Sequence, residues 1–240
     1  MLTLVDIQRI IAECRIAGAR GLGNGSRALI QELHVDVLTP PADFLGVKNN
    51  PAIFVNQDTY CLLGKYHPTW EVNKTIAVKE GILEKNPVMV IGIIVHEAGH
   101  AFNIAAKIVN SEVNAYIFEI EVISMWFKTK NPLFFACSRE ELQAFFHSRL
   151  PFYRAESRHS HYLVALIKDI ETNRIFDPPS IFPSPSGAPK TCRSPRCVML
   201  TPKVGDSNPL KFFKHEASHP SSTGSEEPLS EGDLTANAAN

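Results

Sequence analysis

The 240-residue chain lacks several features that define common classes of protein. It has no uninterrupted run of 18 apolar residues, which argues against a membrane-spanning helix. Its first residues lack the basic start, apolar block and small-residue cleavage site of a secretory signal. Basic charge is not in excess either, because 24 Lys and Arg face 25 Asp and Glu. We therefore expect no membrane span, no nucleic-acid partner, and a location in the cytoplasm or export without a cleaved signal peptide.

Cysteine is also scarce, and its spacing carries little information. The five cysteines are scattered, odd in number and without a CxxC pair: Cys14, Cys61, Cys137, Cys192 and Cys197. Such a set favours free thiols in a reducing compartment over a disulfide framework or a cysteine zinc site.

The composition changes sharply near Asp177. Hydrophobic residues make up 44% of the chain, which suits a globular core, but ten of the 17 prolines follow this point. We predict a folded domain over residues 1–176 and a Pro/Ser-rich, largely disordered tail over 177–240. The acidic, Ser/Thr-rich end of the tail resembles the uncleaved export signals of bacterial type IV secretion effectors. The tail is thus predicted to bind an export apparatus or another partner, the alternative being an inert extension.

Hydrophobic periodicity predicts an α-rich α+β domain. Apolar residues recur at helical spacing from Leu4 to Cys14, and short β-branched segments bounded by turn residues follow. The segment 87–109 is apolar nearly all round as far as His96, so we expect it to be the buried central helix, packed on a small, mostly antiparallel sheet. The predicted strands are 34–38, 52–55 and 75–78; the other predicted helices are 4–14, 28–33, 112–128, one from 139, and 154–173.

The central helix contains the sequence His96-Glu97-Ala98-Gly99-His100. Histidines four residues apart lie on one helical face, about 40° apart around the axis, so both imidazoles can bind one metal ion. Glu97 lies beside them, where it can take a proton from a water molecule that the metal holds. This pattern on a buried helix predicts a catalytic zinc site.

A third ligand is expected from the helix at 112–128, which offers Glu112, Glu119 and Glu121. If the central helix runs to Asn110, His100 lies about 15 Å from the hairpin between the two helices. If the second helix runs back antiparallel, the residue at the same distance from the hairpin as His100 is close to Glu119. This depth matching favours Glu119 as the third ligand. Glu112 would be too distant unless the first helix ended early, and Glu121 faces elsewhere.

His96-Glu97-x-x-His100 with Glu119 resembles the signature of the gluzincin class of zinc metallopeptidases. The resemblance implies that His96, His100 and Glu119 bind one Zn2+ ion and that Glu97 is the general base. The segment Glu112-Val113-Asn114-Ala115 also resembles a second branch of that class, in which an E-x-x-A pattern supplies the ligand. That branch implies Glu112 instead.

Two other sets of residues bear on the site. His215-Glu216-Ala217-Ser218-His219 repeats the motif, but it lies in the tail without a surrounding helix, so we predict that it is not catalytic. A peptidase also needs a donor for the developing oxyanion. On the predicted last helix His159 falls on the apolar stripe, which makes it our first candidate for this donor. Tyr162 and Tyr153 are the next candidates.

The sequence as a whole predicts a zinc endopeptidase with a zincin-like fold, acting on a protein or peptide substrate. An extended substrate would pair with an edge strand at 52–56 or 75–79. The tail suggests an effector that is delivered into another cell. The alternative is a non-enzymatic adaptor in which zinc only staples two helices together.

Overall fold

The computed structural model describes residues 2–39, 50–135 and 137–177, which all belong to the first of the chain's two units, Met1–Arg196 and Cys197–Asn240. Apart from Asp177, the predicted tail lies outside the described residues, and so does the second HExxH motif at 215–219. The described part is α-rich with one small sheet, as the sequence predicts.

The chain opens with helix α1 (Leu4–Arg20), which Thr3 and Asp6 start with a capping box. Its buried face contains Ile7, Ile10 and Cys14, so the amphipathic helix predicted from their spacing is confirmed. The helix predicted at 28–33 is wrong, because these residues have no regular secondary structure.

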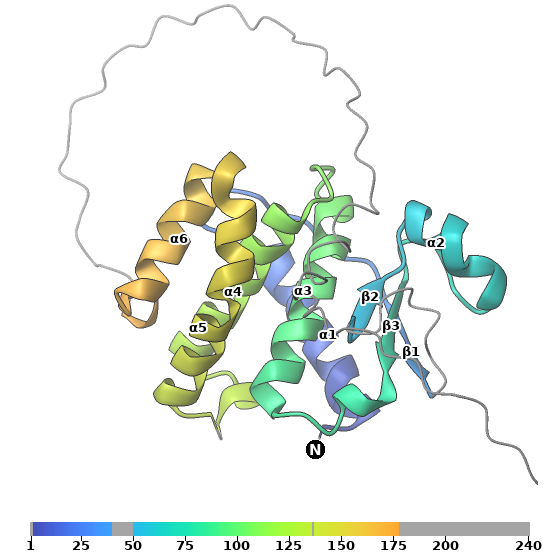
Figure 1. Ribbon diagram of the computed structural model, residues 1–240, viewed down its shortest axis with the longest axis horizontal. Coiled ribbons are helices and arrows are strands. Elements are labelled where there is room, and N and C mark those ends of the chain that lie inside the picture. The colour runs from blue at the N-terminus through green and yellow to red at the C-terminus, as the bar shows by residue number, and fades with distance from the viewer. Residues whose placement is uncertain (1, 40–49, 136, 178–240) are drawn as a thin grey trace, which may run out of the picture. The chain divides into compact units, whose positions relative to one another are not determined.

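Helix α3 (Pro87–Ala105) is the central element of the unit (Figure 1). Asn86 caps it and Pro87 is its first residue, as predicted. It contacts α1, α5 (Arg139–Glu156), α4 (Glu112–Lys128) and strand β2 (Ala52–Phe54). By length and composition α3 could cross a membrane, but 72% of the relevant window is buried inside the protein. Its apolar sequence is therefore accounted for by its position in the core.

Helix α3 ends four residues earlier than predicted. Lys107 adopts a left-handed backbone with φ of 55°. The amides of Lys107 and Ile108 bond to the carbonyls of Ile104 and Asn103, which is the hydrogen-bond pattern of a Schellman motif. The chain then turns back, and Ser111 caps α4.

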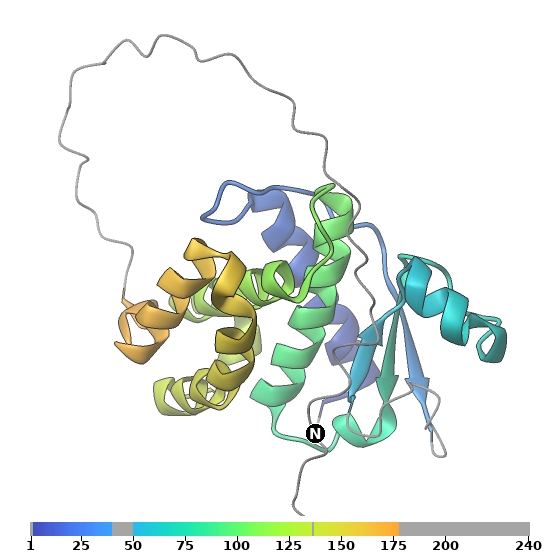
Figure 2. The same ribbon diagram turned by 45° about the horizontal axis from the view of Figure 1, so that its top comes forward.

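Helix α5 is followed by α6 (His161–Glu171), and α4 and α5 both pack against α6 (Figure 2). The predicted capping box of α5, Ser138 with Glu141, is confirmed. The single helix predicted at 154–173 is instead divided, since a 3-10 turn (Ser157–His159) separates Glu156 from the N-cap of α6, Ser160.

The sheet contains β1 (His34–Leu38), β2 and β3 (Thr75–Lys79) in the order β1-β3-β2. The pair β1–β3 is parallel and the pair β2–β3 is antiparallel, so the sheet is mixed and not mostly antiparallel as predicted. Strand β3 is buried along nearly its whole length, which explains its central position. The prediction that 75–79 could serve as an edge is therefore wrong, whereas β2 is an edge strand.

The short helix α2 (Gln57–Leu63) lies between β2 and β3 in the chain and was not predicted. It is followed by a 3-10 turn, Gly64–Tyr66. A small apolar cluster of Leu38, Val55, Trp70 and Ala77 lies apart from the main core, and Tyr60 and Leu63 of α2 pack against it.

Candidate metal centre

The two motif histidines lie on the face of α3 that meets α4. Both side chains are largely buried, with 11% of His96 and 13% of His100 exposed. The two rings are edge to face, with centroids 5.1 Å apart. The helix therefore holds the two imidazoles side by side, as their spacing predicts.

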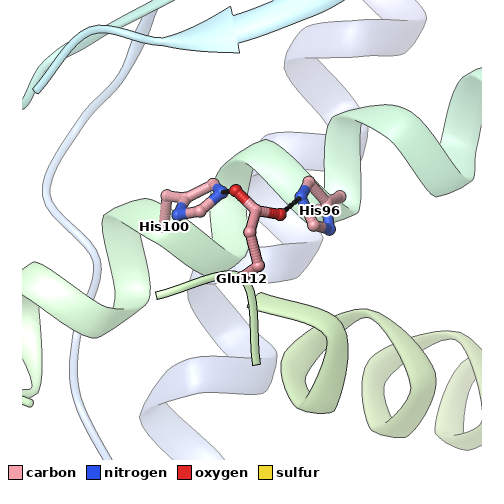
Figure 3. Close-up of side chains that lie close together, drawn as sticks. All are labelled: His96, His100 and Glu112. Carbon is pink, nitrogen blue, oxygen red and sulfur yellow. Dashed lines mark hydrogen bonds and ion pairs between the residues drawn. The ribbon is translucent and has the colours of Figure 1, made fainter. Parts of the chain in front are cut away.

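Glu112, the first residue of α4, joins the two rings (Figure 3). Its Oε2 atom lies 3.0 Å from Nε2 of His96, and its Oε1 atom lies 3.3 Å from Nε2 of His100. One ligand atom from each of the three residues lies within 4.8 Å of the others, so the group could hold one metal ion. Two imidazoles and one carboxylate are a donor set that suits zinc and leaves a coordination position open.

Glu119, the third ligand predicted by depth matching, is not one of the three residues whose ligand atoms lie together. That argument assumed a helix continuing to Asn110, whereas α3 ends at Ala105. The early end places the start of α4 beside His96 and His100. Glu112, the residue that the E-x-x-A resemblance implies, is consequently the one whose carboxylate reaches both Nε2 atoms.

Glu119 instead contacts the other side of the His96 ring. Its Oε2 atom lies 3.0 Å from Nδ1 of His96, and its side chain is completely buried. Arg149 of α5 donates two hydrogen bonds to this carboxylate, from Nε at 2.9 Å and from Nη2 at 2.7 Å. Tyr153 donates a third from its hydroxyl at 2.7 Å. A hydrogen-bonded chain thus runs from α5 through α4 to α3.

His100 has a different neighbour at the corresponding atom. Its Nδ1 lies 2.8 Å from the amide oxygen Oδ1 of Asn110. Both histidines therefore have an acceptor at Nδ1 and turn Nε2 toward Glu112. Acceptors at the non-ligating nitrogen fix the tautomer and the ring orientation of histidine ligands.

The charges of the site reinforce this arrangement. Burial alone would lower the pKa of His96, but Glu112 and Glu119 outweigh it and raise that pKa to about 10. Burial would raise the pKa of Glu119, but the charges of Arg149 and His96 lower it to about 2. Burial would likewise raise the pKa of Glu112, but His100 and His96 outweigh it and hold that pKa far below the usual value. Ionised carboxylates beside the imidazoles favour a cation, and a divalent ion held by these residues would replace the histidine proton.

Glu97 lies next to the group but bonds to the sheet. Its side chain is buried, and its Oε2 atom accepts a hydrogen bond of 2.7 Å from the backbone amide of Phe54. This amide belongs to β2 and points away from β3, because the neighbouring Val55 amide bonds to Thr75 of β3. Glu97 therefore connects the motif helix to the side of β2 that faces away from β3.

None of the three predicted oxyanion donors bonds to His96, His100 or Glu112 in the described part of the chain. His159 is exposed in the 3-10 turn that divides the predicted helix, so it does not lie on an apolar stripe. Tyr162 bonds to Glu121, whose carboxylate also accepts from the Gly23 amide. Tyr153 is buried and bonds to Glu119.

Two residues of the site, Asn110 and Arg149, were missed in the sequence. Arg149 had a recognisable signal, since it falls on the helical stripe of Phe145, Phe146 and Tyr153, all of which are buried. A cation on such a stripe requires a buried acid as partner. Asn110 had no such signal, because its role depends on the turn between α3 and α4.

No family model matches the chain, and the searches of curated proteins and of solved structures gave no match.

Proposed function

We propose that the protein is a zinc-dependent endopeptidase with a zincin-like fold, in which His96, His100 and Glu112 hold the ion. The observation that carries the proposal is the convergence of both Nε2 atoms on Glu112, with an acceptor behind each ring. The donor set and the adjacent Glu97 fit a hydrolytic zinc site better than a closed structural one, because three protein ligands leave a position for substrate.

In this proposal the metal ligands, Glu97 and strand β2 have separate roles in hydrolysis of a peptide bond. A zinc ion held by His96, His100 and Glu112 would supply a Lewis acid for the peptide carbonyl and for the attacking water. Glu97 takes the proton from the attacking water and passes it to the leaving nitrogen. The hydrogen bond from Phe54 holds Oε2 of Glu97, which assigns the proton transfer to Oε1. Strand β2 is the edge beside which an extended substrate would lie.

The substitution Glu97→Gln tests this function. Glutamine keeps an oxygen that can accept from the Phe54 amide, so the fold and the zinc content should be unchanged. Hydrolysis of a labelled unfolded protein should fall by about 10²- to 10⁴-fold, because the proton acceptor is lost. Glu121→Gln is the matched control, since Glu121 bonds to Gly23 and Tyr162 and should leave the rate unchanged. Full activity of Glu97→Gln would contradict the proposal.

The hydrogen bond from Phe54 to Glu97 also favours a second candidate. In that case Glu97 serves as a tether between β2 and α3, and zinc staples α3 to α4 in a protein-binding module. The two candidates differ in chelator-sensitive hydrolysis. Incubating the purified protein with lysates and mapping new N-termini by mass spectrometry would reveal a peptidase and its substrate; zinc binding without new termini would indicate the module.

A further inference from the structure

The two histidines of the candidate metal centre are supported by neighbours of different charge. Behind His96 lies the completely buried Glu119, which Arg149 and Tyr153 bind from α5. Behind His100 lies the neutral amide of Asn110, in the turn before α4. The first support spans three helices and carries a full ion pair, whereas the second is a single uncharged contact.

The ion pair of Arg149 and Glu119 has an unusual position for a pair that serves stability alone. Only 16% of the Arg149 side chain is exposed and none of Glu119, so both groups have lost most of their hydration. Burial of such a pair contributes little net stability in general. The guanidinium also lies over the rings of Tyr116 and Tyr153, at 5.6 and 5.9 Å from their centroids.

The geometry leaves the Glu119 carboxylate little freedom. Its Oε1 atom accepts from Nε of Arg149 and from the Tyr153 hydroxyl, while its Oε2 atom contacts Nη2 of Arg149 and Nδ1 of His96. Tyr116 packs on the His96 ring at 4.7 Å between centroids, which restricts the ring further. Movement of α5 would therefore be transmitted to the orientation of His96.

We propose that Arg149 and Tyr153 are positioning residues which act through Glu119 to fix the His96 ring, and so set the metal affinity of the site. The proposal rests on the metal site of the proposed function, but it does not require that the protein be a peptidase. It also predicts an asymmetry: loss of the charged support behind His96 should weaken metal binding more than loss of the neutral support behind His100.

The test measures zinc affinity of the full chain by competition with a chelating dye. The double variant Glu119→Gln/Arg149→Met removes both charges together, keeps an oxygen for Nδ1 and leaves no buried charge unpaired. Its affinity should fall by about 10- to 100-fold, the usual effect of removing a partner of a histidine ligand. Asn110→Ala should cause a smaller loss of zinc affinity than the double variant. Tyr153→Phe, which removes one of the three donors to Glu119, should also lower the zinc affinity.

The spectrum of bound Co²⁺ provides a readout that a purely structural role would not change. A reoriented His96 should shift the visible absorption bands in the double variant and leave them in place in Glu121→Gln. Wild-type affinity and an unchanged spectrum in the folded double variant would overturn the proposal. If that variant does not fold, Tyr153→Phe decides, and wild-type affinity in it would likewise overturn the proposal.

The outcomes separate this proposal from the proposed function. A wild-type protein that binds zinc but hydrolyses nothing would refute the peptidase, while the affinity measurements would still test the role of Arg149. A wild-type protein that binds no zinc would refute both.

Discussion

At the scale of single residues, Glu112 and Glu119 contact opposite sides of the same imidazole. Glu112 lies on Nε2 and Glu119 on Nδ1 of His96, although both are glutamates of α4 seven residues apart. Seven residues are nearly two helical turns, so both side chains project from the same face of α4. Their roles differ because the first residue of α4, Glu112, lies between the two Nε2 atoms, whereas Glu119 lies further along the helix, on the other side of the His96 ring.

Glu112→Gln should reduce zinc affinity by roughly 100-fold or more, beyond the range for removal of a supporting partner. The amide is a neutral and weaker ligand than the carboxylate between the two Nε2 atoms. The measurement is zinc content and competition with a chelator, with Glu121→Gln as the control on the same helix. Unchanged affinity in Glu112→Gln would refute the assignment of Glu112 as the third ligand.

At the scale of elements, the site depends on the close approach of α3 and α4. Gly99, between the two motif histidines, faces the backbone of α4. A Cβ atom at this position would lie 3.0 Å from the Ala115 carbonyl oxygen and 3.1 Å from its Cα. Backbone atoms cannot rotate away as side chains can, so a larger residue at 99 would push the helices apart.

Gly99→Ala should therefore lower the free energy of unfolding by about 1–3 kcal/mol, the usual cost of overpacking, despite the better helix propensity of alanine. It should also weaken zinc binding, because Glu112 would move away from the histidines. Urea denaturation and chelator competition measure the two effects. Gly81→Ala is the control, since a Cβ there meets nothing within 4 Å; equal stability of the two variants would count against close helix contact at Gly99.

At the scale of the whole molecule, the last described element packs on the helices that carry the site. The last 3-10 turn, Arg174–Phe176, buries Ile175 and Phe176. The Phe176 ring packs on Phe127 of α4 and Phe146 of α5, with centroids 5.7 and 6.1 Å away. These contacts attach the end of the described chain to α4 and α5; the division predicted at residue 177 stays a prediction, and the chain's two compact units divide at residue 196 instead.

A chain that ends at Asp177 should keep the zinc affinity and unfolding free energy of the full protein. A chain that ends at Asn173 should lose several kcal/mol of stability, because removal of a buried Phe side chain alone costs about 3–5 kcal/mol. Denaturant titration of both truncated chains measures this difference. Loss of zinc binding in the chain that ends at Asp177 would show that residues after 177 are needed for the metal site.

Local sequence determined the elements that carry the site. Two helices start through contacts within a few residues, α3 at Asn86 and Pro87 and α5 at Ser138 and Glu141. The apolar residues before His96 make α3 a helix that must be buried. The spacing of His96 and His100 alone places both rings on one face. These features were predictable because each depends on neighbours in the chain.

Tertiary structure decided which acid joins the histidines and which groups support them. The Schellman turn at the end of α3 has Lys107, not glycine, in the left-handed position, so the sequence gives no sign that the helix ends there. That turn brings Glu112 to both Nε2 atoms, while Glu119 bonds to Arg149 and Tyr153 of α5. The hydrogen bonds from Arg149 to Glu119 and from the Phe54 amide to Glu97 likewise join residues 30 and 43 positions apart, which no local pattern encodes.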